Sequence, residues 1–409
     1  MSTPPPLPVR PLADGEAATF MQTAARGFGH TIDDATVAEL VAIELGETSR
    51  AFVSHDADHI VGTALALDWA LAIPYGSSAR CAGVTSVTVA PTHRRRGVLR
   101  SLMRHQLDDL HDGGVAWAAL YSSESAIYGR FGYGVAARSV SARIDRPWTA
   151  FTTPVAPAAV ELVSAEAAVE RVAAIYHAVQ AQVPGMMAVP PRYTEHRVAW
   201  DPPGERGGAS EQFVAIIDDR AYAMYRLAND WDEAGSKARL TVRECLATDA
   251  EAHRQMWTYL FGIDLIQHVR VDRLAIDDPL PWWLAERQRL RLTASMTLYV
   301  RLVDVGTALS QRGTRGRGAV VVDVADAFCP WNERRWQLDG DGRQLRCTTT
   351  DAPPDVWLDV RELASLSLGG VAPGELARAG LLGEHTPGSA AQLTALLAAD
   401  RQPFNPFTF

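Results

Sequence analysis

The chain has 409 residues, of which 47% are hydrophobic and 21% are charged. This length exceeds one ordinary domain and predicts two or three, in a globular rather than a disordered protein. The formal net charge of −9 excludes a basic protein with nucleic acid as its main partner, and it suits a cationic substrate.

The N-terminus and the cysteines bear on where the protein works. Residues 1–12 are rich in proline and lack the apolar core of a secretory signal. The longest apolar run, residues 60–74, is interrupted by Asp68 and is too short to cross a bilayer. The cysteines are dispersed, without the spacing of a zinc site or a disulfide framework. They are Cys81, Cys245, Cys329 and Cys347. We therefore expect a cytoplasmic protein with buried, reduced thiols, no metal and no membrane partner.

Residues 13–48 are predicted to be helical, because apolar side chains recur at helical spacing on two successive faces. The same stretch carries a group of carboxylates. They are Asp33, Asp34, Glu39, Glu44 and Glu47. Each of them alone is explained by a solvated helix surface. Residues 51–55 and 60–69 are then predicted to be antiparallel strands.

Residues 84–134 form the stretch around which the chain is organised. Alternating β-branched residues predict a strand over 84–90, which a proline ends because it has no N–H to donate. Apolar side chains recur at helical spacing over 98–110, and residues 115–121 form a second, almost continuously apolar strand. The predicted unit is strand, basic turn, helix, strand.

The basic turn holds Arg94, Arg95, Arg96 and Gly97 where the helix begins. Free N–H groups and the positive end of the helix dipole meet there, and arginines add bidentate contacts to phosphate oxygens. Arginines at this end of a helix oppose its dipole, so the placement is unfavourable without an anion. A solvated basic loop is the alternative, but the flanking strand and helix favour a phosphate site.

The segment 87–99, Val-Thr-Val-Ala-Pro-Thr-His-Arg-Arg-Arg-Gly-Val-Leu, resembles the acetyl-CoA motif of GNAT N-acetyltransferases. Most of that superfamily has a small residue where this chain has Leu99. Together with Ser123-Glu124 and with Ile-Tyr-Gly-Arg-Phe-Gly-Tyr-Gly at 127–134, it resembles the Eis (enhanced intracellular survival) branch. The resemblance extends over the whole chain. It implies a mixed α/β (α+β) protein with two tandem GNAT-like domains and a C-terminal sterol-carrier-protein-like α+β domain.

This resemblance implies acetyl-CoA as the co-substrate. Backbone N–H groups of an opened strand would face the pantetheine arm and the thioester carbonyl, and the basic turn would hold the pyrophosphate. The expected coenzyme-binding residues are Val87, Thr88, Val89, Arg95, Arg96, Gly97, Val98, Leu99, Arg100, Ser123 and Glu124. For Ser123 and Glu124, an N-cap followed by an acid in the first helical turn is the alternative explanation.

Tyr128 is the expected general acid, because the leaving thiolate must gain a proton and a tyrosine with a pKa of about 10 can supply it. A packed aromatic residue is the alternative. The surrounding Gly129, Gly132 and Gly134 favour the catalytic role, since glycines let a backbone approach a ligand closely. His93, beside three arginines, is interpreted as structural or phosphate-facing rather than as the base.

The expected domains are 1–155, a catalytic GNAT domain; 156–297, a second GNAT-like domain; and 298–409, the sterol-carrier-protein-like domain. Prolines loosen the pattern near the first boundary. The second domain is expected to lack the coenzyme motif, because no Arg-x-x-Gly turn recurs in it. Its Trp282-Trp283 pair is predicted to lie in the core. In the third domain, Asp-Gly-Asp-Gly at 339–342 predicts a hairpin.

The chain ends in Pro-Phe-Asn-Pro-Phe-Thr-Phe, too apolar and too stiff to be disordered. A tail tucked against the protein is the ordinary explanation. The family resemblance implies instead that the terminal carboxylate, here that of Phe409, reaches the active site as general base. The phenylalanines would then dock the tail in a pocket of the first domain. If not, the base is expected among Asp33, Asp34 and Glu39. Thr408 replaces an acidic residue found in some relatives of that family.

These observations predict a cytoplasmic acetyl-CoA-dependent N-acetyltransferase that acts on primary amines of cationic acceptors of the aminoglycoside, polyamine or lysine type. The resemblance implies a homo-oligomer, a hexamer. Two alternatives stay open: a protein lysine acetyltransferase, and a regulatory protein that binds an acyl-CoA or a lipid without turnover.

Overall fold

The computed structural model describes residues 7–46, 48–76, 78–233 and 235–409. Glu47 of the acidic group and residues 1–6 of the proline-rich start thus lie outside the described residues. The chain divides into two compact units. Unit 1 contains the chain up to Ala136, Thr297–Ala399 and Phe409, and unit 2 contains Ala137–Met296 and Asp400–Thr408. The domain divisions expected after residues 155 and 297 stay predictions.

Unit 1 begins with a sheet in the order β1-β2-β3-β4-β5-β15. Its strands are β1 (Val9–Pro11), β2 (Arg50–Asp56), β3 (His59–Ala72), β4 (Ser78–Val89), β5 (Trp117–Tyr121) and the last residues of β15 (Arg291–Leu302). Neighbouring strands are antiparallel except β4 and β5, which are parallel. The parallel pair requires a crossover, which α3 (Val98–Asp112) supplies.

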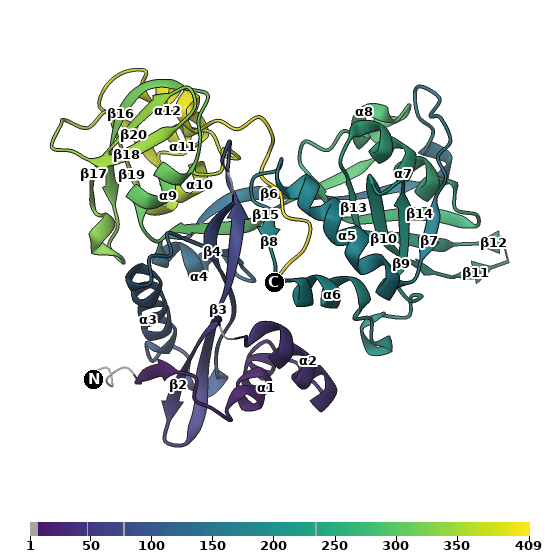
Figure 1. The fold of residues 1–409 in the computed structure, drawn as a ribbon, viewed down its shortest axis with the longest axis horizontal. Helices are drawn as coiled ribbons and strands as arrows, with labels where there is room; N and C mark the ends of the chain where they lie inside the picture. The colour runs from purple at the N-terminus through teal and green to yellow at the C-terminus, as the bar shows by residue number, and fades with distance from the viewer. Residues whose placement is uncertain (1–6, 47, 77, 234) are drawn as a thin grey trace. The chain divides into compact units, whose positions relative to one another are not determined.

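Helices cover both faces of this sheet (Figure 1): α1 (Ala17–Gly27) and α2 (Asp34–Glu44) lie on one side and α3 on the other. The stretch predicted as helical is therefore two helices. Alternation along the strands supplies both contacts. Phe52 and Ala64 pack under α3, whereas Thr88 lies where a Cβ on Gly27 of α1 would collide with it.

The rest of unit 1 is a second sheet in the order β18-β17-β16-β19-β20 with short helices. Its strands are β16 (Arg317–Ala325), β17 (Arg334–Asp341), β18 (Leu345–Thr349), β19 (Val356–Asp359) and β20 (Leu382–Glu384). Its helices are α9 (Val305–Gln311), α10 (Val360–Leu366), α11 (Pro373–Arg378) and α12 (Ser389–Leu397). The predicted hairpin is confirmed as β17–β18. Its turn follows Asp341, whose Oδ1 accepts the N–H groups of Arg343 and Gln344 at 2.8 Å each.

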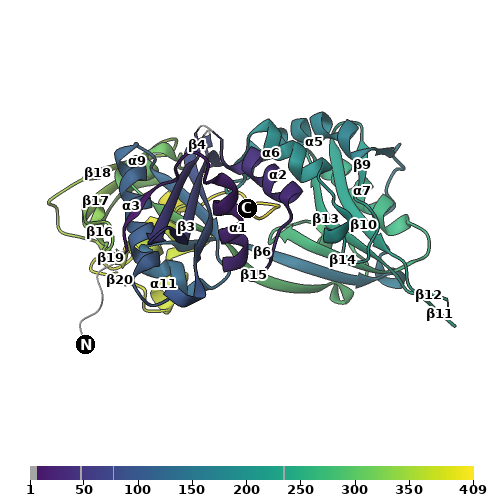
Figure 2. The ribbon, with the colours of Figure 1, turned by 90° about the horizontal axis from the view of Figure 1, so that it is seen from below.

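Unit 2 has a sheet in the order β6-β14-β13-β10-β9-β7, with β13 and β14 parallel. Its strands are β6 (Gly134–Asp145), β7 (Glu161–Val163), β9 (Phe213–Ile217), β10 (Ala221–Ala228), β13 (Ala238–Ala247) and β14 (Ile266–Ala275). One face packs on α7 (Ala250–Gly262) through Met256 and Trp257. On the other, α5 (Ala165–Gln180) and α6 (Pro191–Ala199) lie side by side (Figure 2). Thus β13-α7-β14 repeats the topology of β4-α3-β5.

One core prediction is wrong in part. Trp283, in the short helix α8 (Leu280–Trp283), packs against the core of unit 2. Trp282 is 69% exposed and lies under the guanidinium of Arg287, 5.3 Å from its ring centroid. Two adjacent residues on a helix point in directions about 100° apart, and in α8 only the direction of Trp283 leads into the core.

All four cysteines are buried and free, as predicted. No helix in the described part of the chain is both long and apolar enough to cross a membrane.

Candidate active site

The parallel strands at the centre of unit 1 part before they end. Pairing between β4 and β5 covers only Cys81–Gly83 and Trp117–Ala119 within the described residues. Strand β4 runs on to Val89, so its backbone groups on the β5 side lie beyond the ladder. Unpaired main-chain groups of this kind need another partner, and the pantetheine arm of a coenzyme can provide one.

A β-bulge in β4 marks the same place. Thr63 pairs with Thr88 and Leu65 pairs with Thr85, so Ser86 and Val87 together oppose a single residue of β3. Ser86 has φ 51°, a left-handed conformation that is costly for a residue other than glycine. Such strain recurs where a strand is re-aimed for function.

Side-chain directions limit what the predicted strand residues can offer a ligand. The Thr88 hydroxyl is buried and hydrogen-bonds the Thr63 hydroxyl at 2.8 Å. Val87 and Val89 pack against the cluster beneath α3. The side chains of Val87, Thr88 and Val89 are thus engaged in packing or in a hydrogen bond within the protein. Only the main-chain groups of these residues can contact a coenzyme.

The basic turn follows β4 directly. Gly97 is the N-cap residue of α3 with φ 83°, and no side chain caps the helix. The first N–H groups of α3 therefore stay available to an anion. Arg95 also has a positive φ, 63°, and both Arg94 and Arg95 are exposed. The left-handed backbone conformation explains why a glycine is at position 97.

Arg96 and His93 share one carboxylate. His93 Nε2 lies 2.9 Å from Asp56 Oδ2, and Arg96 Nη1 lies 3.6 Å from the same oxygen. The hydrogen bond from His93, helped by the charge of Arg96, lowers the pKa of Asp56. These contacts fix His93 as a structural residue of the turn, one of the two interpretations that the sequence left open.

The first helical residues behave differently from one another. Val98 is 1% exposed and Leu99 is partly buried against a core that includes Met103, so their side chains serve packing. Arg100 is exposed, with its guanidinium 5.2 Å from the Phe328 ring centroid. Of Val98, Leu99 and Arg100, only Arg100 has an exposed side chain that could contact an anion.

Ser123 and Glu124 are both exposed in the segment between β5 and α4 (Ser125–Tyr128). Glu124 is the N-cap residue, and it makes no side-chain capping bond. The alternative explanation, in which Ser123 caps the helix and Glu124 lies in its first turn, is therefore wrong. Both side chains are accessible to a ligand.

Tyr128 ends α4 and is 9% exposed. Its ring meets that of Tyr133 edge to face, with the centroids 5.8 Å apart. Burial raises the pKa of Tyr128 to about 12, because the phenolate would be poorly solvated. The hydroxyl thus keeps its proton at neutral pH.

The glycines around Tyr128 do not clear space for a ligand, contrary to the expectation. A Cβ on Gly134 would lie 1.9 Å from the carbonyl oxygen of Arg361, and one on Gly132 would lie 1.9 Å from Arg301 Nη1. One on Gly129 would lie 3.3 Å from the Arg361 side chain. These glycines admit residues from the third region of the chain, which holds the Tyr128 segment in place.

The ring of Phe409 is packed within unit 1. It meets Trp69 of β3 and Tyr121 of β5 edge to face, with centroid distances of 4.9 and 5.3 Å. A Cβ on Gly83 would lie 3.4 Å from the same ring. The ring of Phe409 therefore lies against the end of β5 (Trp117–Tyr121). From this end of β5 the chain continues to Tyr128.

The other tail phenylalanines are not docked in the first domain, which corrects the expectation. Phe407 lies in unit 2, with its ring 4.3 Å from the Arg197 guanidinium and 6.0 Å from the Tyr193 ring. Phe404 is also in unit 2, where its N–H donates to the carbonyl oxygen of Pro184 at 2.9 Å.

Two carboxylates of the acidic group have particular settings. Asp33 caps α2, its Oδ1 accepting the N–H of Thr36 at 2.8 Å, and this bond lowers the pKa of Asp33. Burial raises the pKa of Glu44 to about 7. Asp33 is therefore a structural cap, and Glu44 takes up a proton near neutral pH.

The residues that sequence reasoning missed are those that hold the candidate site together. Trp69 and Tyr121 pack against the ring of Phe409. Arg301 and Arg361 fill the space beside the glycines that follow Tyr128. Arg301 is fully buried, and it pairs with Asp326. No local pattern marks them, because each contacts residues more than 100 positions away. No cluster of His, Cys, Asp and Glu able to hold a metal occurs in the described ranges.

Comparisons with known proteins match each region of the chain. Residues 8–136 and 185–302 match acetyltransferase (GNAT) domain families, and residues 305–406 match the sterol carrier protein domain family. The two GNAT domains and the sterol-carrier domain establish the predicted fold class. GNAT acetyltransferases use acetyl-CoA.

Individual relatives span nearly the whole chain. An uncharacterized N-acetyltransferase of Streptomyces avermitilis is 36% identical over 408 residues, 98% of this chain and 99% of that protein. N-acetyltransferase Eis of Mycobacterium bovis is 34% identical over 357 residues, 83% of this chain and 84% of that protein. The crystal structure of Eis1 from Mycobacterium abscessus superimposes with a TM-score of 0.86 at 31% identity, covering 98% of this chain and 100% of that one. The chain is accordingly an N-acetyltransferase, and it belongs to the Eis family of GNAT enzymes.

Proposed function

We propose that this enzyme transfers acetyl from acetyl-CoA to a primary amine of a cationic acceptor, with Tyr128 as general acid and the Phe409 carboxylate as general base. The observation that carries the proposal is the grouping of three features within unit 1. All three adjoin the strands that part after Gly83 and Ala119. They are the basic turn without a side-chain cap, the buried and protonated Tyr128, and the ring of Phe409 packed on Tyr121.

The proposed chemistry moves two protons. The ammonium of the acceptor loses one to the terminal carboxylate, directly or through water, and the free amine forms a bond to the acetyl carbonyl carbon. The carbon–sulfur bond breaks, and Tyr128 donates its proton to the departing thiolate. The nitrogen then loses its second proton, which restores the Tyr128 hydroxyl directly or through water. Main-chain N–H groups of the opened β4 stabilise the negative charge that develops on the carbonyl oxygen.

The coenzyme residues have complementary parts in this proposal. Val87, Thr88 and Val89 contribute backbone groups, and Val98 and Leu99 contribute helix N–H groups because their side chains are packed. Arg95, Arg96 and Arg100 supply the charge, and Gly97 supplies the turn. Exposed Ser123 and Glu124 complete the set.

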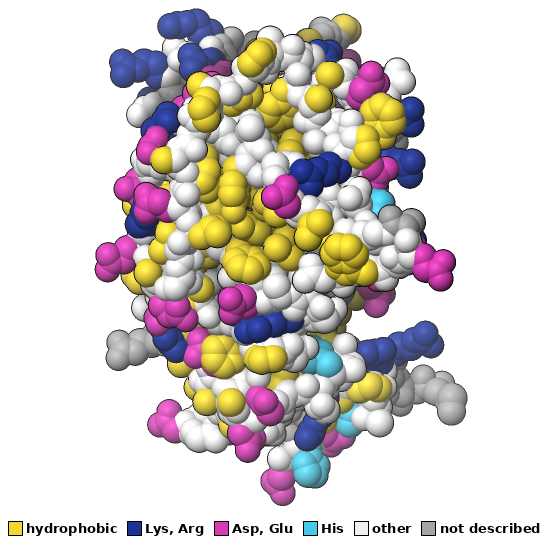
Figure 3. All heavy atoms as spheres, turned by 90° about the vertical axis from the view of Figure 1, so that its right-hand side faces the viewer, with side chains coloured by type: hydrophobic (Ala, Val, Ile, Leu, Met, Phe, Trp, Pro, Cys, Tyr) yellow, Lys and Arg dark blue, Asp and Glu magenta, His cyan; other side chains and the backbone are white. Residues whose placement is uncertain are grey.

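A cationic acceptor fits the charge of the protein. The chain carries −9 overall. On the face that Figure 3 shows, acidic side chains are interspersed with Lys and Arg side chains around an apolar centre. Asp34, Glu39 and Glu44 lie on α2, beside the sheet that carries the candidate site. Polyamines, aminoglycosides and lysine side chains all present such amines. We propose the small-molecule acceptors first and a protein lysine as the second candidate. Membership of an N-acetyltransferase family argues against a binding protein without turnover.

An acceptor screen tests the proposal. The protein is supplied with acetyl-CoA and, in separate reactions, with spermidine, an aminoglycoside, a lysine-containing peptide or no amine, and free thiol is measured. We expect amine-dependent thiol release with at least one of the first two. Release with the peptide alone would favour the lysine acetyltransferase, and no amine-dependent release would contradict the proposal. The family resemblance also supports a cytoplasmic location and a homohexamer. Light scattering after gel filtration measures the mass of the assembly and so tests the hexamer.

A further inference from the structure

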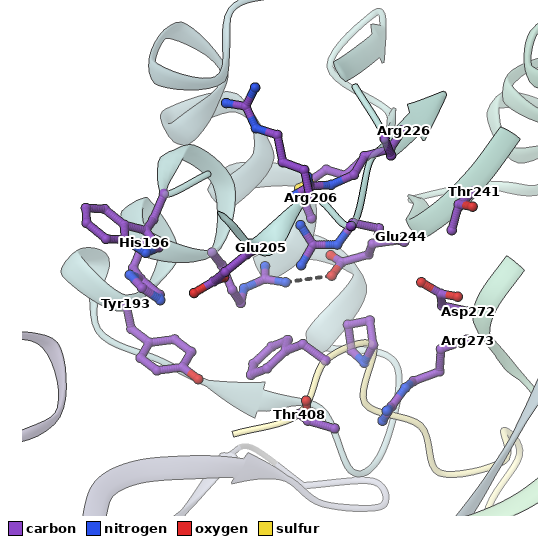
Figure 4. A pocket seen from close by; sticks show the side chains of 18 of the residues that line it. Tyr193, His196, Glu205, Arg206, Arg226, Thr241, Glu244, Asp272, Arg273 and Thr408 are labelled. Atoms are coloured by element: carbon purple, nitrogen blue, oxygen red, sulfur yellow. Dashed lines mark hydrogen bonds and ion pairs between the residues drawn. The ribbon is translucent and has the colours of Figure 1, made fainter. Parts of the chain in front are cut away.

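A cavity of about 570 Å³ lies within unit 2, and none of the residues that line it is among those assigned above to the coenzyme (Figure 4). Its walls come from α6, the following loop, strands β10, β13 and β14, and residues 406–408 of the tail. The family matches assign this region a fold, but the acetyl-transfer proposal gives the cavity no role.

The wall of the cavity is rich in arginine, unlike the acidic protein around it. Three acidic residues, Glu205, Glu244 and Asp272, face six arginines. The arginines are Arg197, Arg206, Arg226, Arg239, Arg243 and Arg273. A concentration of one charge in a concave site attracts ligands of the opposite charge.

The charges on this wall are only partly neutralised by the protein. Asp201 serves two arginines, Arg206 and Arg226. The Arg243 Nη1 group donates to a neutral acceptor, the side-chain oxygen of Gln212, at 2.6 Å. Burial and the nearby Arg226 lower the pKa of Arg243, and together they outweigh the opposing charges of Glu244, Asp272 and Asp201.

Arg197 carries the clearest sign of a missing partner. Its side chain is 9% exposed, and its Nη1 donates to Glu244 Oε2 at 2.6 Å. Its Nε and Nη2 atoms are buried and make no hydrogen bond with any residue that the structure describes. Buried donors of a charged group without acceptors are costly, and an oxyanion in the cavity would supply the acceptors.

The position of the cavity within the sheet supports a ligand site. The parallel strands β13 and β14 are paired as far as Val242 and Val271 within the described residues, and the residues just beyond line the cavity. This place is topologically equivalent to the parting of β4 and β5 in unit 1. Ligands of α/β sheets bind where parallel strands diverge in this way.

Acetyl-CoA is not the ligand expected there. The helix after β13 is capped by Asp249, whose Oδ1 accepts the N–H of Ala252 at 2.9 Å. A carboxylate thus occupies the helix end at which a pyrophosphate would bind, and it would repel one. The arginines instead gather at the strands and α6, where the aromatic rings of Tyr193, Trp200 and Phe407 also line the wall.

We propose that this cavity binds a small, multiply charged oxyanion, held by the arginine forks of Arg197, Arg239 and Arg243 and bordered by the tail at Phe407 and Thr408.

Calorimetric titration of the full-length protein with inorganic pyrophosphate, and separately with citrate, tests the site. Arg243→Gln removes a charge from the cavity, and Arg239→Gln removes one at an exposed position where folding is not at risk. Arg192→Gln is the matched control, because Arg192 lies on α6 but pairs with Glu195 at 3.0 Å outside the cavity. Arg96→Ala reports binding of either anion at the basic turn of unit 1.

We expect saturable binding of at least one anion, weakened about tenfold or more in both cavity variants, as for a lost charged hydrogen bond. Arg192→Gln and Arg96→Ala should retain it. The proposal is overturned by the absence of saturable binding, by equal affinity in the cavity variants and wild type, or by binding that only Arg96→Ala removes. If circular dichroism shows that Arg243→Gln is unfolded, Arg239→Gln decides. None of these readouts requires turnover.

Discussion

A departing thiolate needs an acid that still carries its proton at the working pH, and Tyr128 meets this condition through burial. Its pKa of about 12 keeps the hydroxyl protonated at neutral and mildly alkaline pH. Ionisation of Tyr128 should therefore leave the pH profile of turnover flat up to about pH 10, two units below that pKa.

Tyr128→Phe is the first test at the scale of a residue. The change removes one hydroxyl and little volume, so we expect a folded protein whose turnover number falls roughly 100-fold, as for loss of a general acid. Steady-state thiol release measures it.

Tyr133→Phe is the matched control for that variant. Tyr133 packs edge to face on Tyr128, and its buried hydroxyl has no hydrogen bond with the described residues, so its removal should leave turnover near that of wild type. Near-normal turnover in folded Tyr128→Phe would reduce Tyr128 to a packing residue.

Arg96→Ala tests the coenzyme turn. Arg96 is held near Asp56 at the start of α3, where its charge adds to the uncapped helix N–H groups. We expect acetyl-CoA to bind about tenfold or more weakly, as for loss of a charged hydrogen bond, in a calorimetric titration. Arg80→Ala, which removes an exposed arginine paired with Asp68 on the same sheet, is the control. Unchanged affinity in Arg96→Ala would place the pyrophosphate elsewhere.

At the scale of elements, the segment from α4 into β6 depends on glycines that admit the third region of the chain. Gly134 accommodates the carbonyl oxygen of Arg361 and the hydroxyl of Ser365. Gly134→Ala should therefore cost about 1–3 kcal/mol through overpacking and lower the melting temperature.

Gly204→Ala is the control for this prediction. A Cβ on Gly204 would meet no atom within 4 Å, so the melting temperature should stay close to that of wild type. Equal melting temperatures for the two variants would mean that the contact at Gly134 is not a constraint on the fold.

The same segment shows what the sequence could and could not predict. The strand, turn and helix around Arg96 follow from local periodicity. Helix α3 and strand β5 lie within two residues of the predicted ranges, whereas β4 begins at Ser78, before the strand predicted over 84–90. Gly132 and Gly134 were misinterpreted, because their partners Arg301 and Arg361 come from a region more than 160 residues away. Local patterns specify elements, whereas such contacts depend on packing between elements distant in sequence.

Trp282 illustrates the same limit in a simpler form. Its large apolar side chain suggested burial, but the direction set by α8 leaves it exposed next to Arg287. Hydrophobicity predicts burial only when the residue also faces the core.

At the scale of the whole molecule, the end of the chain belongs to both compact units. Asp400–Thr408 belongs to unit 2, and Phe409 belongs to unit 1, where Trp69 and Tyr121 hold its ring. A short tail fixed by aromatic contacts can present its terminal carboxylate in one place at a small entropic cost.

The chain terminus also decides where the base must be sought. If the Phe409 carboxylate does not act, Asp34 and Glu39 on α2 remain among the carboxylates that the sequence analysis named. Asp33 is less suited, because it caps the helix.

The most direct test of the Phe409 carboxylate as general base is to extend the chain by a few residues after Phe409 and to measure turnover and acetyl-CoA binding together. The extension turns the terminal carboxylate into an amide and leaves the ring of Phe409 in the sequence. The same residues added at the N-terminus serve as the control. We predict that the C-terminal extension abolishes amine-dependent thiol release while acetyl-CoA binds with unchanged affinity, and that the N-terminal extension changes neither. Full turnover with the C-terminal extension would contradict the assignment of Phe409 as the base.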